Sequence, residues 1–248
     1  MGELDAIKTL EQYLAPIPEW CDDGERGVCR SSNHQWRQTA IPIPDTQNNT
    51  DLQKAMKVVG SPPKPQPDLS FGYTQKTFTE KEVINMRSVL PLLVTNESPY
   101  FPYLVYEWKS EKNGGTMHVA NRQAIRDGAG AVHSMCNVLE RNGTQVPSES
   151  TVVFSICISS YLELRIHWRT RTADKTTWEN RCIHKAFLDD PRAVFYTRLM
   201  IRNIISWAYG DRLKMVRATL APAAGKSKSE NKTPTVDCGM VEVLPNIR

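Results

Sequence analysis

The sequence predicts an α/β protein in which a mixed central sheet is flanked by helices, with a long helix added at the C-terminal end. Helical and strand periodicities alternate along the chain, as the helical pattern of residues 119–141 and the strict alternation of residues 161–169 show. The apolar run at residues 100–106 is typical of a central strand that is covered on both faces. Elements in this order favour a sheet with helices packed around it.

The N-terminal part is expected to be mostly irregular. Leucine and isoleucine at helical spacing predict a short amphipathic helix over residues 3–14. Residues 21–67 are rich in Pro, Asn, Asp and Gly, which predicts loops with at most one short strand or helix near residues 51–58. Residues 68–73 alternate and predict a strand, and a helix is expected to begin at residues 79–82.

The middle of the chain predicts a strand, a turn and a long helix. The strand covers residues 100–109, and Gly114-Gly115 makes the turn that follows it. The helical pattern of residues 119–141 contains Gly128 and Gly130. Glycine costs about 1 kcal/mol relative to alanine inside a helix, so close packing of this helix against the sheet explains the two glycines better than helix propensity does.

The C-terminal part predicts further strands and the last helix. A buried strand is expected at residues 151–158, and residues 177–187 are expected to pair with the alternating segment. In that segment Glu163, Arg165, His167 and Arg169 share one face, which predicts a half-exposed strand with a basic outer face. Asp190 is a cap candidate before Pro191, and the helix that starts there is expected to run to about residue 217.

Length and composition favour one globular domain. The chain has 248 residues, of which 40% are hydrophobic and 23% charged. We expect a single domain over residues 1–220, whose first 60 residues form the N-terminal helix and a loop-rich extension, followed by a flexible tail at residues 221–248. No apolar stretch is long enough to cross a bilayer, and the first residues carry no secretory signal.

The cysteines favour a reducing compartment over a disulfide framework. Six are scattered through the chain, and Cys136 and Cys157 fall in apolar segments. We therefore expect an intracellular protein, nuclear or cytoplasmic. Structural zinc held by Cys21, Cys29 and His34 is an alternative, although a fourth ligand is missing from this spacing.

Positive charge is concentrated in one segment. The net charge is +4, but residues 160–217 alone contain 12 basic and 6 acidic side chains. Such a segment suits a polyanion, and Arg165, Arg169 and Arg171 are its candidate phosphate contacts. The alternative interpretation is a solvated face that only keeps the protein soluble.

A candidate metal site lies at the end of the predicted central strand. Glu107 and Lys109 are two residues apart on a strand, so their side chains share one face. Asp68 opens the preceding strand and can stand beside Glu107, and Gln123 lies near the start of the next helix. Two carboxylates with a lysine favour Mg²⁺ or Mn²⁺, which prefer oxygen ligands. Alone, the Glu-x-Lys spacing is weak, because it recurs in the tail at Glu230 and Lys232.

These residues resemble the PD-(D/E)XK, or restriction-endonuclease-like, nuclease superfamily. The segments YFPYLVYEWK at residues 100–109, GGT at 114–116 and ANRQA at 120–124 are similar to those of a largely uncharacterised fungal nuclease-like family. The resemblance covers about residues 33–215 and implies a restriction-endonuclease-like α-β-β-β-α-β core. It also implies that Asp68 and Glu107 bind the metal.

The same resemblance assigns the other roles and the activity. Lys109 would be the catalytic lysine and Gln123 an auxiliary site residue, and Glu3 or Glu11 could add a further metal ligand. The expected function is divalent-metal-dependent hydrolysis of phosphodiester bonds in DNA, with RNA less favoured. Because this superfamily includes members that keep the fold without catalysis, an inactive module that binds nucleic acid or a protein partner is the alternative. The sequence does not indicate an oligomeric state.

Overall fold

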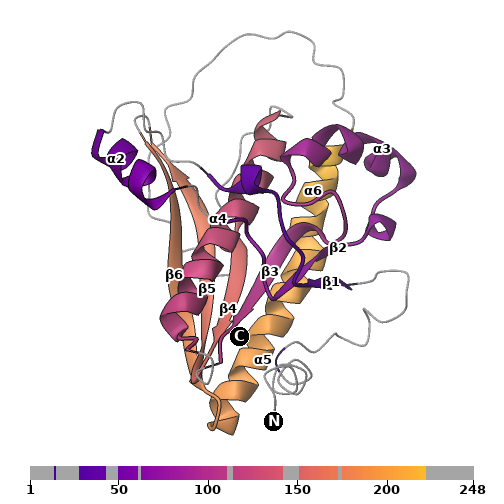
Figure 1. Ribbon diagram of the computed structural model, residues 1–248. Coiled ribbons are helices and arrows are strands. Elements are labelled where there is room, and N and C mark those ends of the chain that lie inside the picture. The colour runs from indigo at the N-terminus through magenta and orange to yellow at the C-terminus, as the bar shows by residue number, and fades with distance from the viewer. Residues whose placement is uncertain are drawn as a thin grey trace.

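A single six-stranded sheet organises the part of the chain that the structure describes (Figure 1). The computed structural model describes residue 14 and residues 28–42, 50–60, 63–110, 114–141, 151–172 and 175–221. Its strands are β1 (Val28–Ser32), β2 (Leu69–Tyr73), β3 (Tyr100–Trp108), β4 (Val153–Ile158), β5 (Tyr161–Arg171) and β6 (Thr176–Phe187). Its helices are α2 (Thr50–Val59), α3 (Glu80–Val89), α4 (Met117–Arg141), α5 (Pro191–Trp207) and α6 (Leu213–Leu220).

The strands follow one another across the sheet in chain order, and all neighbours except one are antiparallel. The exception is β3 with β4, which run parallel. Parallel neighbours need a crossover connection, and α4 supplies it. The predicted α/β class, with a mixed sheet, flanking helices and a long C-terminal helix, is therefore confirmed.

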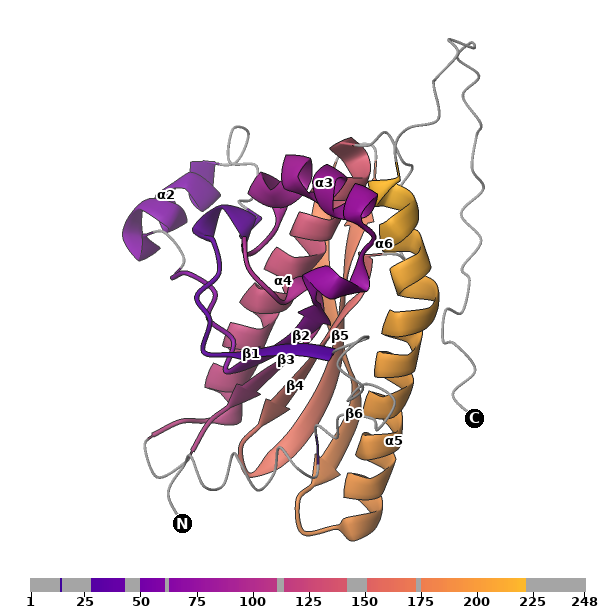
Figure 2. The same ribbon diagram turned by 90° about the vertical axis from the view of Figure 1, so that its right-hand side faces the viewer.

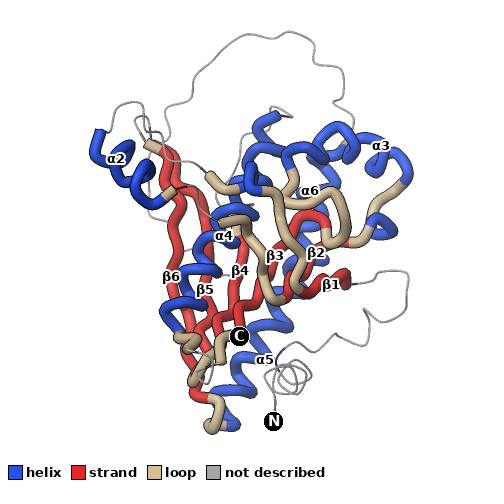
Figure 3. The backbone as a smooth tube through the Cα atoms, in the orientation of Figure 1, coloured by secondary structure: helices blue, strands red, loops and turns tan. Residues whose placement is uncertain are grey.

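Helices cover the two faces of the sheet (Figures 2 and 3). Figure 2 shows α4 on one side of the strands and the long C-terminal helical segment, α5 and α6, on the other, and the tube view distinguishes the blue helices from the red strands. The main core lies on the α5–α6 side, where Ile201 and Val216 belong to the same buried cluster as Leu104 of β3. On the other side Val105 of β3 packs in a cluster with Val132 of α4. Because side chains alternate along a strand, Glu107 shares the α4 side with Val105.

Several local predictions are confirmed by the helix ends. Thr79 and Glu82 form a reciprocal capping box at the start of α3. The side chain of Asp190 accepts hydrogen bonds from the backbone of Arg192 and Ala193 and caps α5, with Pro191 in the first turn. The segment left open near residues 51–58 is helix α2. The helix expected over residues 3–14 and the tail lie outside the described residues, apart from Leu14 and Ala221.

The last helix contains one irregular turn. The sequence predicts a single helix to about residue 217, and the structure gives a continuous helical segment to Leu220. Residues Ala208–Arg212 form a π-helical turn between α5 and α6. Arg212, at the end of that turn, is only 2% exposed and faces the core. None of the helices described is long and apolar enough to span a membrane.

The prediction of a basic outer face on β5 is wrong. That face lies under α4, and Glu163 and His167 are only 3% and 2% exposed. The physical reason is the glycine in α4, since a Cβ atom on Gly128 would lie 2.5 Å from ring atoms of His167. A helix can approach a sheet this closely only where it has no side chain. The predicted close packing of this helix is thus confirmed, and it buries the face that the alternation pattern left open.

We expect Gly128→Ala to destabilise the fold by about 1–3 kcal/mol, because overpacking a buried contact forces neighbouring groups to shift. Gly210→Ala is the matched control, since a Cβ atom there would meet nothing within 4 Å. Urea unfolding of the two variants and the wild type measures the difference. Equal midpoints for the two variants would contradict the proposed contact between α4 and His167.

Candidate functional site

The predicted site residues lie at one end of two neighbouring strands. In the antiparallel pairing of β2 and β3, Leu69 is opposite Tyr106, so Asp68, immediately before β2, comes beside Glu107. Glu107 is the penultimate residue of β3, and Lys109 directly follows that strand. The backbone N–H of Lys109 still donates to the carbonyl of Ile158, at the end of β4, which holds the lysine in line with the strand.

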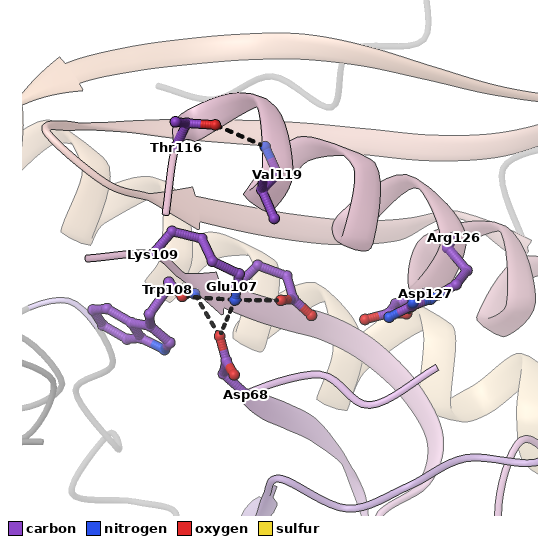
Figure 4. Close-up of polar contacts among 8 residues, drawn as sticks. All are labelled: Asp68, Glu107, Trp108, Lys109, Thr116, Val119, Arg126 and Asp127. Carbon is purple, nitrogen blue, oxygen red and sulfur yellow. Dashed lines mark hydrogen bonds and ion pairs between the residues drawn. The ribbon is translucent and has the colours of Figure 1, made fainter. Parts of the chain in front are cut away.

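The structure brings the three side chains together (Figure 4). The ammonium Nζ of Lys109 donates to Asp68 Oδ2 at 3.3 Å and to Glu107 Oε2 at 3.4 Å, and it also donates to the carbonyl of Trp108 at 2.8 Å. The backbone N–H of Trp108 donates to the same Asp68 oxygen at 2.6 Å. Asp68 is therefore held by the end of β3 as well as by its own strand, which fixes the relative position of the two carboxylates.

Burial differs sharply across this group. The side chains of Asp68 and Lys109 are 26% and 17% exposed, whereas that of Glu107 is fully buried. The site is thus open to solvent on the Asp68 and Lys109 side and closed around Glu107. A substrate would meet the lysine and the aspartate first.

The carboxyl group of Glu107 is destabilised as an anion. Burial is the main cause that raises its pKa, and the neighbouring Asp127 and Asp68 raise it further, to about 10. The Lys109 ammonium opposes this shift, but it does not offset the other causes. Without a further cation, Glu107 therefore keeps its proton at neutral pH even though it lies within reach of a lysine.

Asp127 is a member of this cluster that the sequence reasoning missed. It lies on α4 and is fully buried, and its Oδ1 accepts from Arg126 Nε at 2.9 Å. Figure 4 shows the carboxyl group of Glu107 pointing toward it. Burial is the main cause that raises the pKa of Asp127 as well. The signal was present in the sequence: Asp127 continues the small-residue stripe of Ala120 and Ala124, which marks the buried face of this helix.

Gln123 is half-buried on α4, one turn before Asp127. Its side-chain oxygen Oε1 is buried and has no hydrogen-bond partner among the described residues. No contact links it directly to Asp68, Glu107 or Lys109 in the part of the chain that the structure describes. Its predicted auxiliary role therefore stays a prediction.

The three candidate phosphate-binding arginines already have acidic or amide partners. Arg165 donates to Glu163 and to Asn180, each at 2.6 Å. Arg169 and Arg171 donate to the same oxygen of Glu140, at 2.7 and 3.1 Å. Of the three side chains only that of Arg171 is well exposed, at 67%, against 15% and 10% for Arg165 and Arg169. A polyanion would have to compete with these pairs.

The donor set around Glu107 suits a small hard cation. Among the described residues no group of three or more His, Cys, Asp or Glu side chains is arranged to hold a metal ion. Mg²⁺, however, is often held by one or two carboxylates plus substrate phosphate and water. Asp68 and Glu107 provide two such carboxylates, and Glu107 Oε1 has no hydrogen-bond donor among the described residues.

The zinc alternative gains no support from the described residues. His34, one of its candidate ligands, makes a hydrogen bond through Nε2 to the hydroxyl of Thr95 at 3.0 Å. Cys21, like the possible extra ligands Glu3 and Glu11, lies outside the described residues, and so does the side chain of Cys29.

Comparison with known proteins places the chain in a family. Residues 5–220 match the model of a family described as Domain of unknown function (DUF7924). The chain belongs to this DUF7924 family. No curated protein and no solved structure matches it. The DUF7924 match includes all the described strands and helices, and with them Asp68, Glu107, Lys109, Gln123 and Asp127.

We expect Glu107→Gln to stabilise the metal-free protein near pH 8. The folded protein holds a proton on Glu107 up to a pKa of about 10, whereas the unfolded chain loses it near a pKa of about 4.3. Between these values the folded state binds more protons, so the free energy of unfolding falls as pH rises. Glutamine removes this dependence, so its stabilising effect should grow by about 3 kcal/mol between pH 5.5 and pH 8, since one pH unit in this range corresponds to about 1.4 kcal/mol.

Urea unfolding in EDTA at pH 5.5 and at pH 8 measures this effect. Glu179→Gln, at an exposed position on β6, is the control and should leave both values unchanged. A Glu107→Gln variant whose advantage is the same at both pH values would contradict a buried, protonated Glu107.

Proposed function

We propose that this protein is a divalent-metal-dependent nuclease that hydrolyses phosphodiester bonds. One observation carries the proposal: the ammonium group of Lys109 lies between the carboxylates of Asp68 and Glu107 at the ends of two adjacent strands. In this proposal Asp68 and Glu107 hold Mg²⁺ or Mn²⁺. A metal bound there supplies charge to neutralise a phosphate oxygen and to make a bound water more acidic.

The protein's own residues have separate tasks in this scheme. Lys109 Nζ, which is partly exposed, can donate to the attacking water or to a phosphate oxygen as negative charge develops in the transition state. The backbone N–H of Trp108 keeps Asp68 in place while the lysine changes partner. The closed surroundings of Glu107 lower the local dielectric, which strengthens each of these electrostatic interactions.

The order of the strands also supports the proposal. Strands β1, β2 and β3 pair antiparallel in chain order, with α2 and α3 in their connections, α4 crosses over, and β4 pairs in parallel with β3. Apart from the helices in those connections, this matches the order of the last five elements in the α-β-β-β-α-β core that the sequence resemblance implies. The remaining element, a helix expected over residues 3–14, lies outside the described residues apart from Leu14.

DNA is the substrate that we favour over RNA, and the inside of the cell is the expected location. Cys136, Cys157 and Cys182 are free thiols among the described residues, which suits the reducing environment of the nucleus or cytoplasm. Of the three candidate arginines, Arg171 has the most exposed side chain and is therefore the one that we expect to contact phosphate outside the site.

The alternative is a module that binds nucleic acid or a protein partner without cleaving it. The full burial of Glu107 favours this alternative, because a carboxylate that binds substrate-linked metal is usually reachable from solvent. The Lys109 ion pairs could then serve only to hold the two strand ends together. Cleavage assays separate the two functions.

We expect the purified protein to cleave DNA in Mg²⁺ or Mn²⁺ and not in EDTA. Lys109→Ala and Asp68→Asn should each lower the rate by about 100-fold or more, as the loss of a charge-stabilising group usually does. Linear duplex DNA, single-stranded DNA and RNA should be tested side by side. Lys175→Ala and Asp211→Asn are matched controls, because both residues are exposed and lie away from this site.

Binding that weakens steeply with salt, without cleavage in either metal, would reject the nuclease and favour the alternative. Cleavage that persists at the wild-type rate in both site variants would show that the activity arises elsewhere in the chain or in a contaminant.

A further inference from the structure

The cluster around Glu107 contains more negative than positive groups. Asp68, Glu107 and Asp127 supply three carboxyl groups, and Lys109 and Arg126 supply the two cations that contact them. Glu107 and Asp127 are both fully buried, where an uncompensated anion is strongly unfavourable. One further positive charge is therefore needed if all three groups are ionised.

The two buried carboxyl groups use only half of their oxygens on these cations. Glu107 Oε2 accepts from Lys109, and Asp127 Oδ1 accepts from Arg126. The other oxygens, Glu107 Oε1 and Asp127 Oδ2, are buried and have no donor among the described residues. The Glu107 carboxyl group points from β3 toward α4, where Asp127 lies (Figure 4). Two buried carboxyl groups therefore face each other, and each has an oxygen without a partner among the described residues.

A divalent cation between these two oxygens would give both of them a partner and supply the missing positive charge. Oxygens that bind one octahedral Mg²⁺ at about 2.1 Å are about 3 Å apart at neighbouring positions, so two carboxyl groups that point toward each other can share one ion.

The side-chain oxygen of Gln123 adds a neutral donor to the same region. Gln123 and Asp127 are four residues apart on α4, so they lie on one face of the helix. Gln123 Oε1 is a further buried oxygen that lacks a hydrogen-bond donor among the described residues. Carboxylate and amide oxygens together are typical ligands of hard cations.

The thiol of Cys157 does not compete for this position. Cys157 of β4 is the register partner of Glu107, and burial raises the pKa of its thiol to about 12. A protonated thiol is a poor metal ligand, since metals bind the thiolate. The available ligands are therefore oxygens, which favours Mg²⁺ or Mn²⁺ over zinc.

We propose that Glu107, Asp127 and Gln123 form an oxygen-ligand site for Mg²⁺ or Mn²⁺ between β3 and α4, on the opposite side of Glu107 from its contact with Lys109. This site is distinct from the position between Asp68 and Glu107, and it does not depend on phosphodiester cleavage. Glu107 joins the two positions, with Oε2 on one side and Oε1 on the other.

Calorimetric titration of the full-length protein with Mn²⁺ alone, at pH 7.5, tests the site. Asp127→Asn should weaken Mn²⁺ binding at least 10-fold or remove one equivalent. The exposed control Asp211→Asn should leave this binding within about 3-fold of wild type. Thermal unfolding in EDTA checks folding, and Asp127→Asn should keep its transition there because asparagine can donate a hydrogen bond to Glu107. Only the rise in melting temperature caused by Mn²⁺ should disappear.

Gln123→Leu is the second variant if Asp127→Asn folds poorly, and it should weaken Mn²⁺ binding at least 3-fold. Wild-type protein that binds no Mn²⁺, or an Asp127→Asn or Gln123→Leu variant that binds it as wild type does, overturns the proposal. Failure of this proposal can be distinguished from failure of the proposed nuclease function. If Mn²⁺ binding requires Asp127 but no cleavage is seen, the metal site is supported and the nuclease is rejected. If the protein cleaves DNA and Asp127→Asn binds Mn²⁺ as wild type does, the nuclease is supported and the metal site is rejected.

Discussion

The close approach of α4 to the sheet is the constraint on which the rest of the structure depends. Helix α4 makes the crossover that allows β3 and β4 to run parallel, and Gly128 lets it contact the ring of His167. The same approach places Asp127 against the end of β3 and closes the surroundings of Glu107. If the helix lay further from the sheet, Glu107 would be solvated and burial would not raise the pKa of its carboxyl group. The β5 face that contains Glu163 and His167 would then be exposed, as its alternation pattern suggests.

Buried charged groups have different kinds of partner on the two sides of the sheet. On the α5–α6 side, the guanidinium of Arg212 donates to the carbonyls of Phe101 and Pro102 and to the hydroxyl of Tyr73, and it lies over aromatic rings. Polar and aromatic partners thus surround this cation without any carboxylate. On the α4 side, Glu107 and Asp127 each keep an oxygen without a donor among the described residues. Arg212 Nε also lacks a hydrogen-bond partner among the described residues, so one unpaired atom does not by itself mark a ligand site. The acidic pair differs because Glu107 points toward Asp127 and each of the two carboxyl groups keeps an unpaired oxygen.

The sequence was sufficient to predict features that depend only on neighbouring residues. The capping box at Thr79 and the cap at Asp190 depend only on neighbouring residues, and both are present. Strand pairing also placed Asp68 beside Glu107, because an antiparallel register follows from two recognisable strands. The basic face of β5 was mispredicted, since alternation shows that one face differs from the other but does not show what packs on it. Asp127 was missed for a related reason: an acidic residue on a small-residue helix face looks like a surface residue until its neighbour across the interface is known.

The π-helical turn at Ala208–Arg212 sets the rotational phase of the last helix. Successive residues of an α-helix are separated by about 100° around its axis, so an extra residue in one turn rotates everything after it by about that amount. Leu213, Val216 and Leu220 all face the core despite this turn. Deleting a single residue here would restore a regular helix and rotate α6 by about 100° around its axis relative to α5. The length of this turn therefore decides which side chains of α6 face the core.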